Sequence, residues 1–212
     1  MAGAKRFIAV TLSTVLAFAL SGPAHASSGS TTIVSDRNIT VEVIASNGSG
    51  CAPGTARVTG NADDTGFRVR YQNFTAEAGG NADPTSSRKN CQLSVLVTTP
   101  PGWTVAIAEA EYRGRAHLHS GASALHRTNY YWQGSSRDNR VNERFAGPFF
   151  GTWSTRDVEA VLHYAPCAEQ RVLNLNTELR VDARGSSSRS SMSMSATEGN
   201  AETLFNISWA RC

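Results

Sequence analysis

Apolar and polar residues alternate with a period of two along most of the chain after residue 38. Side chains on a β-strand point to opposite faces in turn, so this pattern predicts strands with one buried face. Segments of this kind, often rich in β-branched and aromatic residues, cover residues 39–46, 55–60, 65–78, 91–99, 103–119, 128–133, 158–164, 171–183, 188–197 and 203–212. No window shows the sustained 3.6-residue apolar stripe with caps that an amphipathic helix requires.

Turn residues separate these segments at short intervals, as in "TTPPGW" at 98–103, where proline removes a donor from the strand ladder. Many strands at this spacing are typical of an antiparallel sandwich or barrel. The sequence therefore predicts an all-β fold. We expect a two-sheet antiparallel β-sandwich, jelly-roll-like or immunoglobulin-like, with about eight to ten strands.

The clearest alternation lies at residues 103–119, which we expect to form one long strand, bent at Gly114. From residue 109 to residue 119, one parity carries only ionisable side chains, and we call it the charged ladder: Glu109, Glu111, Arg113, Arg115, His117 and His119. The other parity is mostly small and apolar: Ala106, Ala108, Ala110, Tyr112, Ala116 and Leu118. Burying six ionisable groups together would be costly, so the ladder is expected to face solvent.

Two chemistries could use this ladder, and neither is favoured by the sequence. His117 and His119 could bind a metal, but a site needs a third ligand, and the positions of His126 and His163 cannot be deduced from the sequence. A Glu-x-Glu pair has the carboxylate spacing of an inverting glycosidase, yet every such pair on a strand has it. We therefore predict no catalytic residue, no metal and no cofactor.

Aromatic residues in "NYYWQG" at 129–134 and "FFGTW" at 149–153 offer a second candidate surface. These aromatic side chains could form a platform for a sugar or a protein partner: Tyr130, Tyr131, Trp132, Phe149, Phe150 and Trp153. The alternative, which we favour, is that they pack in the core of the sandwich, as buried aromatic residues usually do. The candidate ligand or partner face consists of the charged ladder together with Tyr130, Tyr131 and Trp132.

The first 26 residues predict export. A basic start with Lys5 and Arg6, an apolar run at 7–20 and the sequence "AHA" at 24–26 have the layout of a signal peptide cleaved after Ala26. Residues 27–32 are expected to form a flexible lead-in and residues 33–212 a single domain. No apolar run after the signal is long enough to span a membrane.

Removal of the signal peptide lowers the net charge. The chain has 20 basic and 17 acidic residues, and loss of Lys5 and Arg6 leaves 18 and 17. A net charge of +1 without clustered lysine and arginine is not typical of a nucleic-acid-binding protein, so none is expected as a partner.

Four cysteines remain after cleavage, an even number that favours disulfides in an exported chain. Three pairings are possible, and the sequence cannot choose between them with certainty. We expect the sequential pairing, Cys51 with Cys91 and Cys167 with Cys212, because each pair brackets one block of strands.

Residues 50–134 resemble a family of secreted proteins known as domain of unknown function 4360. The resemblance is carried by "GCAPGTARV" at 50, "DDTGFRVRYQNFTAEAG" at 63, "RKNCQLSVLVTTPPGWTVAI" at 88, "YRGRAHLHSG" at 112 and "YYWQG" at 130. It implies an exported, disulfide-containing, β-rich domain without an assigned activity, and it supplies no catalytic residues.

Taken together, these features favour a secreted binding module without enzymatic activity, whose partner is a glycan or protein of a cell envelope. A secreted hydrolase acting on polysaccharide is one alternative, because catalytic groups can assemble from distant segments. A small secreted toxin or inhibitor is another, since export and disulfides suit it equally.

Overall fold

The computed structural model describes residues 37–195 and 201–212. The signal peptide and the lead-in expected at residues 1–32 lie outside the described residues. Within the described ranges the chain forms one short 3₁₀-helix, η1 (Pro84–Ser87), and twelve strands, which are β1 (Thr40–Asn47), β2 (Ala56–Gly60), β3 (Gly66–Tyr71), β4 (Thr75–Ala78), β5 (Arg88–Thr98), β6 (Trp103–Leu118), β7 (Ser123–Trp132), β8 (Asn139–Ala146), β9 (Phe149–Val158), β10 (Gln170–Asp182), β11 (Ser190–Ser193) and β12 (Thr203–Arg211).

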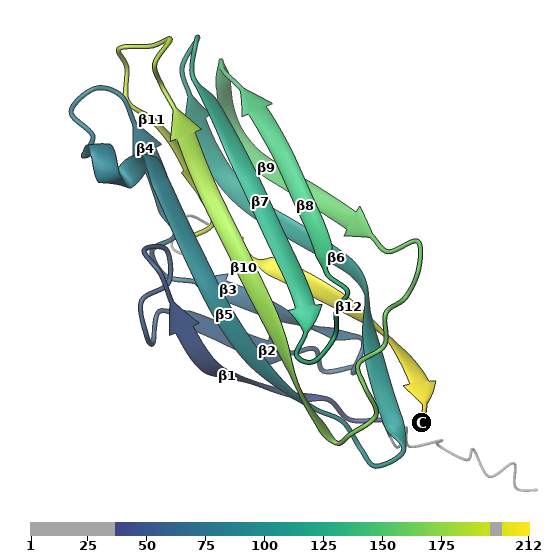
Figure 1. Ribbon diagram of the computed structural model, residues 1–212. Helices are drawn as coiled ribbons and strands as arrows, with labels where there is room; N and C mark the ends of the chain where they lie inside the picture. The colour runs from purple at the N-terminus through teal and green to yellow at the C-terminus, as the bar shows by residue number, and fades with distance from the viewer. Residues whose placement is uncertain (1–36, 196–200) are drawn as a thin grey trace, which may run out of the picture. The chain divides into compact units, whose positions relative to one another are not determined.

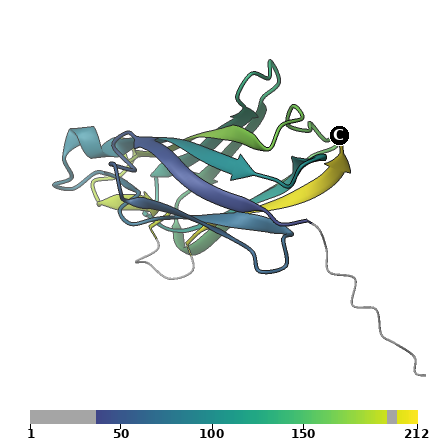
Figure 2. The same ribbon diagram turned by 90° about the horizontal axis from the view of Figure 1, so that it is seen from below.

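The strands form two antiparallel sheets, which confirms the predicted fold class. The five-stranded sheet has the order β1-β5-β10-β7-β8, and Figure 1 shows β5, β10, β7 and β8 side by side. The seven-stranded sheet has the order β2-β3-β12-β6-β11-β4, with β9 paired to β6. Apolar side chains of both sheets form one core between them, and Figure 2 shows the layers from below.

Strand β6 organises the seven-stranded sheet because three strands pair with it. β12 pairs along Trp103–Tyr112 and β11 along Arg115–His117, whereas β9 pairs along Glu109–Leu118. Since β9 overlaps both other partners, it must occupy the opposite edge of β6. β12 and β11 therefore lie one after the other along a single edge.

The predicted alternation of β6 holds only for the residues that follow Ala108 in the chain. Glu109 and Ile107 pair with consecutive residues of β12, so Ala108 has no partner there and forms a bulge. A bulge reverses which parity faces the core. Val105 and Ile107 belong to the core cluster before the bulge. Ala106 is buried at 0% exposure but lies outside that cluster, and Ala108 is only half-buried, so the expectation that Ala108 faces the core was wrong.

The irregularity in β6 had been expected at Gly114, but it lies at Ala108 instead. Gly114 pairs in register with Trp153 of β9. A Cβ atom on Gly114 would lie 2.0 Å from the carbonyl oxygen of Ser193 and 2.7 Å from the Trp153 indole. The glycine is required because the backbone of β11 and a buried tryptophan approach β6 here.

The described residues form twelve strands, more than the expected eight to ten, and the difference arises at the following segments. The segment at 65–78 is two strands, β3 and β4. β8 and β9 were not predicted, because the solvent faces of such strands are polar and their apolar positions few. The segment predicted as a strand at 158–164 is instead irregular after Val158.

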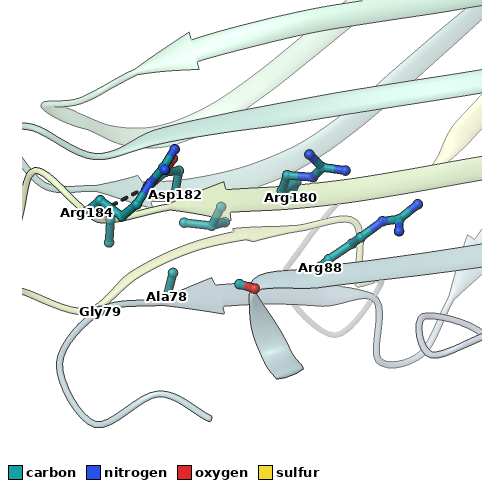
Figure 3. Close-up of a pocket in the computed structure, with 9 residues that line it drawn as sticks. Ala78, Gly79, Arg88, Arg180, Asp182 and Arg184 are labelled. Atoms are coloured by element: carbon teal, nitrogen blue, oxygen red, sulfur yellow. Dashed lines mark hydrogen bonds and ion pairs between the residues drawn. The ribbon is translucent and has the colours of Figure 1, made fainter. Parts of the chain in front are cut away.

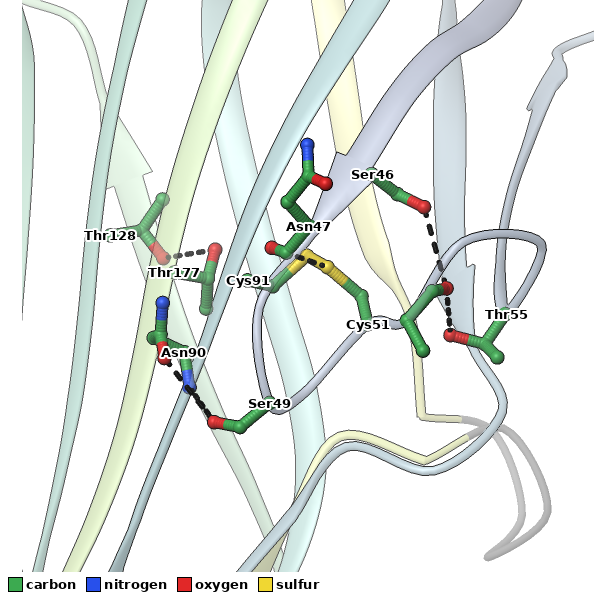
Figure 4. Close-up of a disulfide and its surroundings, with 10 residues drawn as sticks. Ser46, Asn47, Ser49, Cys51, Thr55, Asn90, Cys91, Thr128 and Thr177 are labelled. Atoms are coloured by element: carbon green, nitrogen blue, oxygen red, sulfur yellow. Dashed lines mark hydrogen bonds between the residues drawn. A yellow bond between two sulfur atoms is a disulfide. The ribbon is translucent and has the colours of Figure 1, made fainter.

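Both predicted disulfides are confirmed. Cys51 and Cys91 are bonded with a Cα–Cα distance of 5.2 Å, and Cys167 and Cys212 with 5.8 Å. The first bridge is buried and joins the β1–β2 loop to β5, where the Ser49 hydroxyl also hydrogen-bonds Asn90 (Figure 4). The second joins the segment before β10 to the end of β12 at the surface.

The described residues, 37–195 and 201–212, belong to one compact unit. Within residues 37–195 and 201–212, no helix has the length and hydropathy that a membrane span requires.

Candidate functional site

The charged ladder lies on the outer face of the seven-stranded sheet. In the half of the ladder from Glu109 to Arg113, the carboxylates are paired with arginines. Arg156 of β9 donates to both carboxylate oxygens of Glu109 at 2.5 and 2.9 Å. Arg113 holds Glu111 in the same way at 2.7 and 2.8 Å. The hydrogen bonds from Arg156 lower the pKa of Glu109 below its ordinary value.

These pairs bear directly on the glycosidase interpretation. A general acid needs a carboxyl group whose pKa is raised, so that it stays protonated at the working pH. Glu109 is instead held ionised by a neighbouring guanidinium, and Glu111 has the same kind of partner. The Glu109–Glu111 pair is therefore not arranged as an acid and base pair.

The other half of the ladder, from Arg115 to His119, is open, and it is joined there by one of the aromatic residues that the sequence offered as a platform for a sugar. Phe150 of β9 stands beside His117 on the outer face, with its side chain 57% exposed. The Phe150 ring lies edge-on to both imidazoles, with centroid distances of 4.4 Å to His117 and 5.4 Å to His119. We call these residues, together with Arg115 and Ser191, the Phe150 site.

A shallow depression of about 320 Å³ follows the Phe150 site. It is lined by Arg115, Ala116, His117, Phe150, Gly151 and Ser191. The absence of a side chain at Gly151 keeps it open, since nothing lies within 4 Å of the position that a Cβ would take. The depression thus combines one exposed aromatic ring with guanidinium, imidazole and hydroxyl groups.

Alternation along β9 explains why one of two adjacent phenylalanines is exposed. Phe149 packs against the core and Phe150 points outward, as consecutive strand residues must. Behind them, Trp153 is buried against Gly114. The exposed ring therefore stands on a rigid strand whose other face is fixed by the core.

The aromatic residues of the segment at 129–134 are not brought to the ladder. Tyr130 and Trp132 are core residues, 1% and 4% exposed, so the core interpretation holds for both. Tyr131 points outward, but from the five-stranded sheet, on the other side of the sandwich. The structure thus divides the candidate residues between two outer faces and the core.

Tyr130 takes part in a carboxylate cluster that sequence reasoning missed. Its hydroxyl hydrogen-bonds Asp157 at 3.1 Å and Glu159 at 2.5 Å. Burial, reinforced by the charge of Asp157, raises the pKa of Glu159 above its ordinary value. No signal in the sequence links these residues, because the contact joins strands of opposite sheets.

Replacing Glu159 by glutamine is expected to stabilise the protein at pH 7. A raised pKa in the folded state favours the protonated carboxyl, so its stabilising contribution is present at low pH and lost as the pH rises through the folded-state pKa. Glutamine mimics the protonated form and still accepts from Tyr130. Denaturant unfolding at pH 4 and pH 7 tests this, with Glu169→Gln at an exposed loop position as control. A variant less stable than wild type at pH 7 would contradict the assignment.

A larger groove, of about 590 Å³, lies between β4 and the end of β10 (Figure 3). Arg88 and Arg180 on its wall both pair with Glu178, at 2.5 and 2.9 Å, and Arg184 pairs with Asp182. The arginines of this groove are thus already neutralised in part by carboxylates of β10. In the described ranges, no group of three or more His, Cys, Asp or Glu side chains is placed to hold a metal ion.

The chain is similar to a family and to one secreted protein of unknown function. The family model described as "Domain of unknown function (DUF4360)" matches residues 37–212. A protein of Arthroderma benhamiae, described as an uncharacterized secreted protein, is 24% identical over 174 residues, which cover 78% of this chain and 68% of the relative.

Two solved structures are distantly similar. The structure of TmCBM61 in complex with β-1,4-galactotriose has a TM-score of 0.27 and 8% identity, covering 82% of this chain and 88% of that chain. The enzymatically active domain of bacteriophage CBA120 tailspike protein 4 has a TM-score of 0.21 and 12% identity, covering 84% of this chain and 20% of that chain. Neither TM-score is high enough to support an inference about this chain.

Proposed function

We propose that this chain, which belongs to the family described as domain of unknown function DUF4360, is a secreted, non-enzymatic module that binds a glycan of a cell envelope at the Phe150 site. The observation that carries the proposal is the exposed Phe150 ring in a polar depression on a rigid sheet. Disulfides persist in oxidising compartments, so the two bridges support an extracellular location, as does the relative described as secreted.

The chemistry of the site fits a sugar better than an apolar ligand. An aromatic ring packs against the apolar C–H face of a pyranose, while nearby polar groups fix its orientation by hydrogen bonds. Arg115, His117 and Ser191 supply such groups around the Phe150 ring. The depression is open and shallow, which suits one or two sugar residues of a longer chain.

Phe150→Ala is expected to weaken glycan binding by about tenfold or more, since removing an aromatic stacking partner costs about 1–3 kcal/mol. The matched control is Val158→Ala, because Val158 is 60% exposed on the same face of the same strand. Both variants should unfold at the wild-type temperature, because neither removes a core side chain.

Binding is first measured on an immobilised glycan array and then by calorimetry with the glycan that binds. Equal losses in Phe150→Ala and Val158→Ala would show that the ring has no specific role. Absence of binding to any arrayed glycan would refute the proposed function itself.

A further inference from the structure

We propose that the outer face of the five-stranded sheet is a second, separate binding surface, and that it binds an acidic polysaccharide lying across the strands. This surface goes beyond the Phe150 site, because it belongs to the other sheet and faces away from it. It consists of outward side chains of β5, β10, β7 and β8, which pair in continuous register.

The centre of the surface is a row of three amides and one guanidinium that crosses four strands. Gln92, Asn176, Asn129 and Arg140 are successive cross-strand partners. All four point away from the core, since the alternate residues of each strand form it. In the described part of the chain, the side chains of Gln92 and Asn176 have no hydrogen-bond partner, so both amides are free to bind a ligand.

A second row follows two residues further along each strand. Asn90, Glu178, Arg127 and Asn142 are partners in the same register. The Nε of Arg127 donates to the Asn142 side chain at 2.7 Å, which orients the guanidinium and leaves its terminal nitrogens available. On the other side of the central row, Asn174 lies between Ser94 and Tyr131.

This composition is unusual for a solvent-facing sheet. Asparagine is depleted in strands, where β-branched and aromatic residues fit better. The central strand β10 nevertheless places Asn174 and Asn176 at successive outward positions, flanked by further amides on both neighbouring strands. Amides carry a donor and an acceptor side by side, which matches the hydroxyl groups of a sugar.

The spacing of the rows also fits a glycan. Neighbouring strands lie about 4.8 Å apart, which is close to the length of one pyranose residue in an extended chain. A polysaccharide crossing the strands would therefore meet one hydrogen-bonding side chain per sugar. A flat sheet face provides such a repeat over four strands, whereas the Phe150 site accommodates only one or two residues.

The charge of the surface favours a glycan that carries carboxylates. A third row places Arg88, Arg180 and Arg144 beside the other two. With Arg127 and Arg140, the three rows carry five arginines. Arg88 and Arg180 share Glu178, and Arg140 pairs with the adjoining Asp138, so the positive charges exceed the two carboxylates by three. Guanidinium groups bind carboxylates through paired hydrogen bonds, so the excess of arginine complements uronic-acid residues.

Soluble polygalacturonate is the probe, with its fully methyl-esterified form as the neutral comparison. Asn176→Ala and Gln92→Ala are each expected to weaken polygalacturonate binding by about tenfold, because each removes hydrogen bonds to the ligand. The matched control is Asn206→Ala, an outward asparagine of the other sheet. Phe150→Ala is expected to leave this binding unchanged, so failure here is distinguishable from failure of the Phe150 site.

Three outcomes would overturn the proposal. In the first, Arg127→Gln and Arg140→Gln abolish binding while the amide variants do not, which would indicate adsorption by charge alone. In the second, polyglutamate binds as tightly as polygalacturonate, which would indicate an acidic protein as the partner. In the third, neither form of the polysaccharide binds to the wild-type protein.

Discussion

Between pH 7.5 and pH 5, wild-type protein is expected to lose about 2 kcal/mol more of its free energy of unfolding than the His126→Leu variant loses, since each unit of pKa difference is worth about 1.4 kcal/mol. His126 lies on β7 in the core between the sheets and is fully buried. Burial lowers the pKa of His126 from 6.5 to about 3. Between these two pKa values, His126 is therefore protonated in the unfolded chain and neutral in the folded chain.

The sign follows from this difference. A lowered pKa in the folded state means that His126 contributes stability above the unfolded-state value, and this contribution is lost as the pH falls towards the folded-state value. No ion pair between a carboxylate and the imidazole is found among residues 37–195 and 201–212, and burial is the cause of the lowered pKa. Nε2 lies 3.0 Å from the Thr128 hydroxyl, Nδ1 has no partner among the described residues, and the nearest rings are Tyr112 and Trp153.

The measurement is denaturant unfolding at intervals of half a pH unit. Carboxylates titrate in wild type and variant alike, so the difference between the two curves isolates His126. His117→Leu removes an imidazole from the surface and is the matched control. Parallel curves for wild type and His126→Leu would show that the buried imidazole becomes protonated, or accessible to water, without unfolding.

The fold could be predicted from the sequence because period-two alternation reports burial directly. The charged ladder shows this, since Tyr112, Ala116 and Leu118 are buried and the intervening residues face outward. The prediction failed for the residues before Ala108, because a bulge inserts one residue and changes which alternate side chains face the core. Bulges depend on pairing with β12, which lies nearly a hundred residues away, so local alternation does not contain them.

The two proposed surfaces could not be read from the sequence for a similar reason. Phe150 reaches His117 only because β9 pairs with β6, and the sequence signal is limited to two adjacent phenylalanines, one of which must point outward. The amide rows require the strand order β5-β10-β7-β8, which is not the order of the chain. The asparagines at alternate positions of β10 are visible in the sequence, but their alignment with Gln92 and Asn129 is not.

Removal of the buried disulfide is expected to have the largest effect on stability. Cys51→Ala/Cys91→Ala should lower the free energy of unfolding by about 4 kcal/mol through the larger entropy of the unfolded chain. Loss of packing adds to this, because both cysteines are buried at 0% and 1% exposure. The bridge fixes the β1–β2 loop against β5, where Gly50 also donates to the carbonyl oxygen of Asn90 at 2.8 Å.

The second disulfide provides the matched control, because the two bridges close loops of similar length. Their sequence separations are 40 and 45 residues, so the chain-entropy contribution is nearly the same for both. Cys167 and Cys212 are exposed, and Cys167→Ala/Cys212→Ala should therefore cost the entropy alone. Denaturant unfolding of both double variants should show the greater loss for Cys51→Ala/Cys91→Ala. Equal losses would mean that the buried bridge contributes no packing, and a greater loss for the exposed pair would mean that the closure of β10 and β12 limits stability instead.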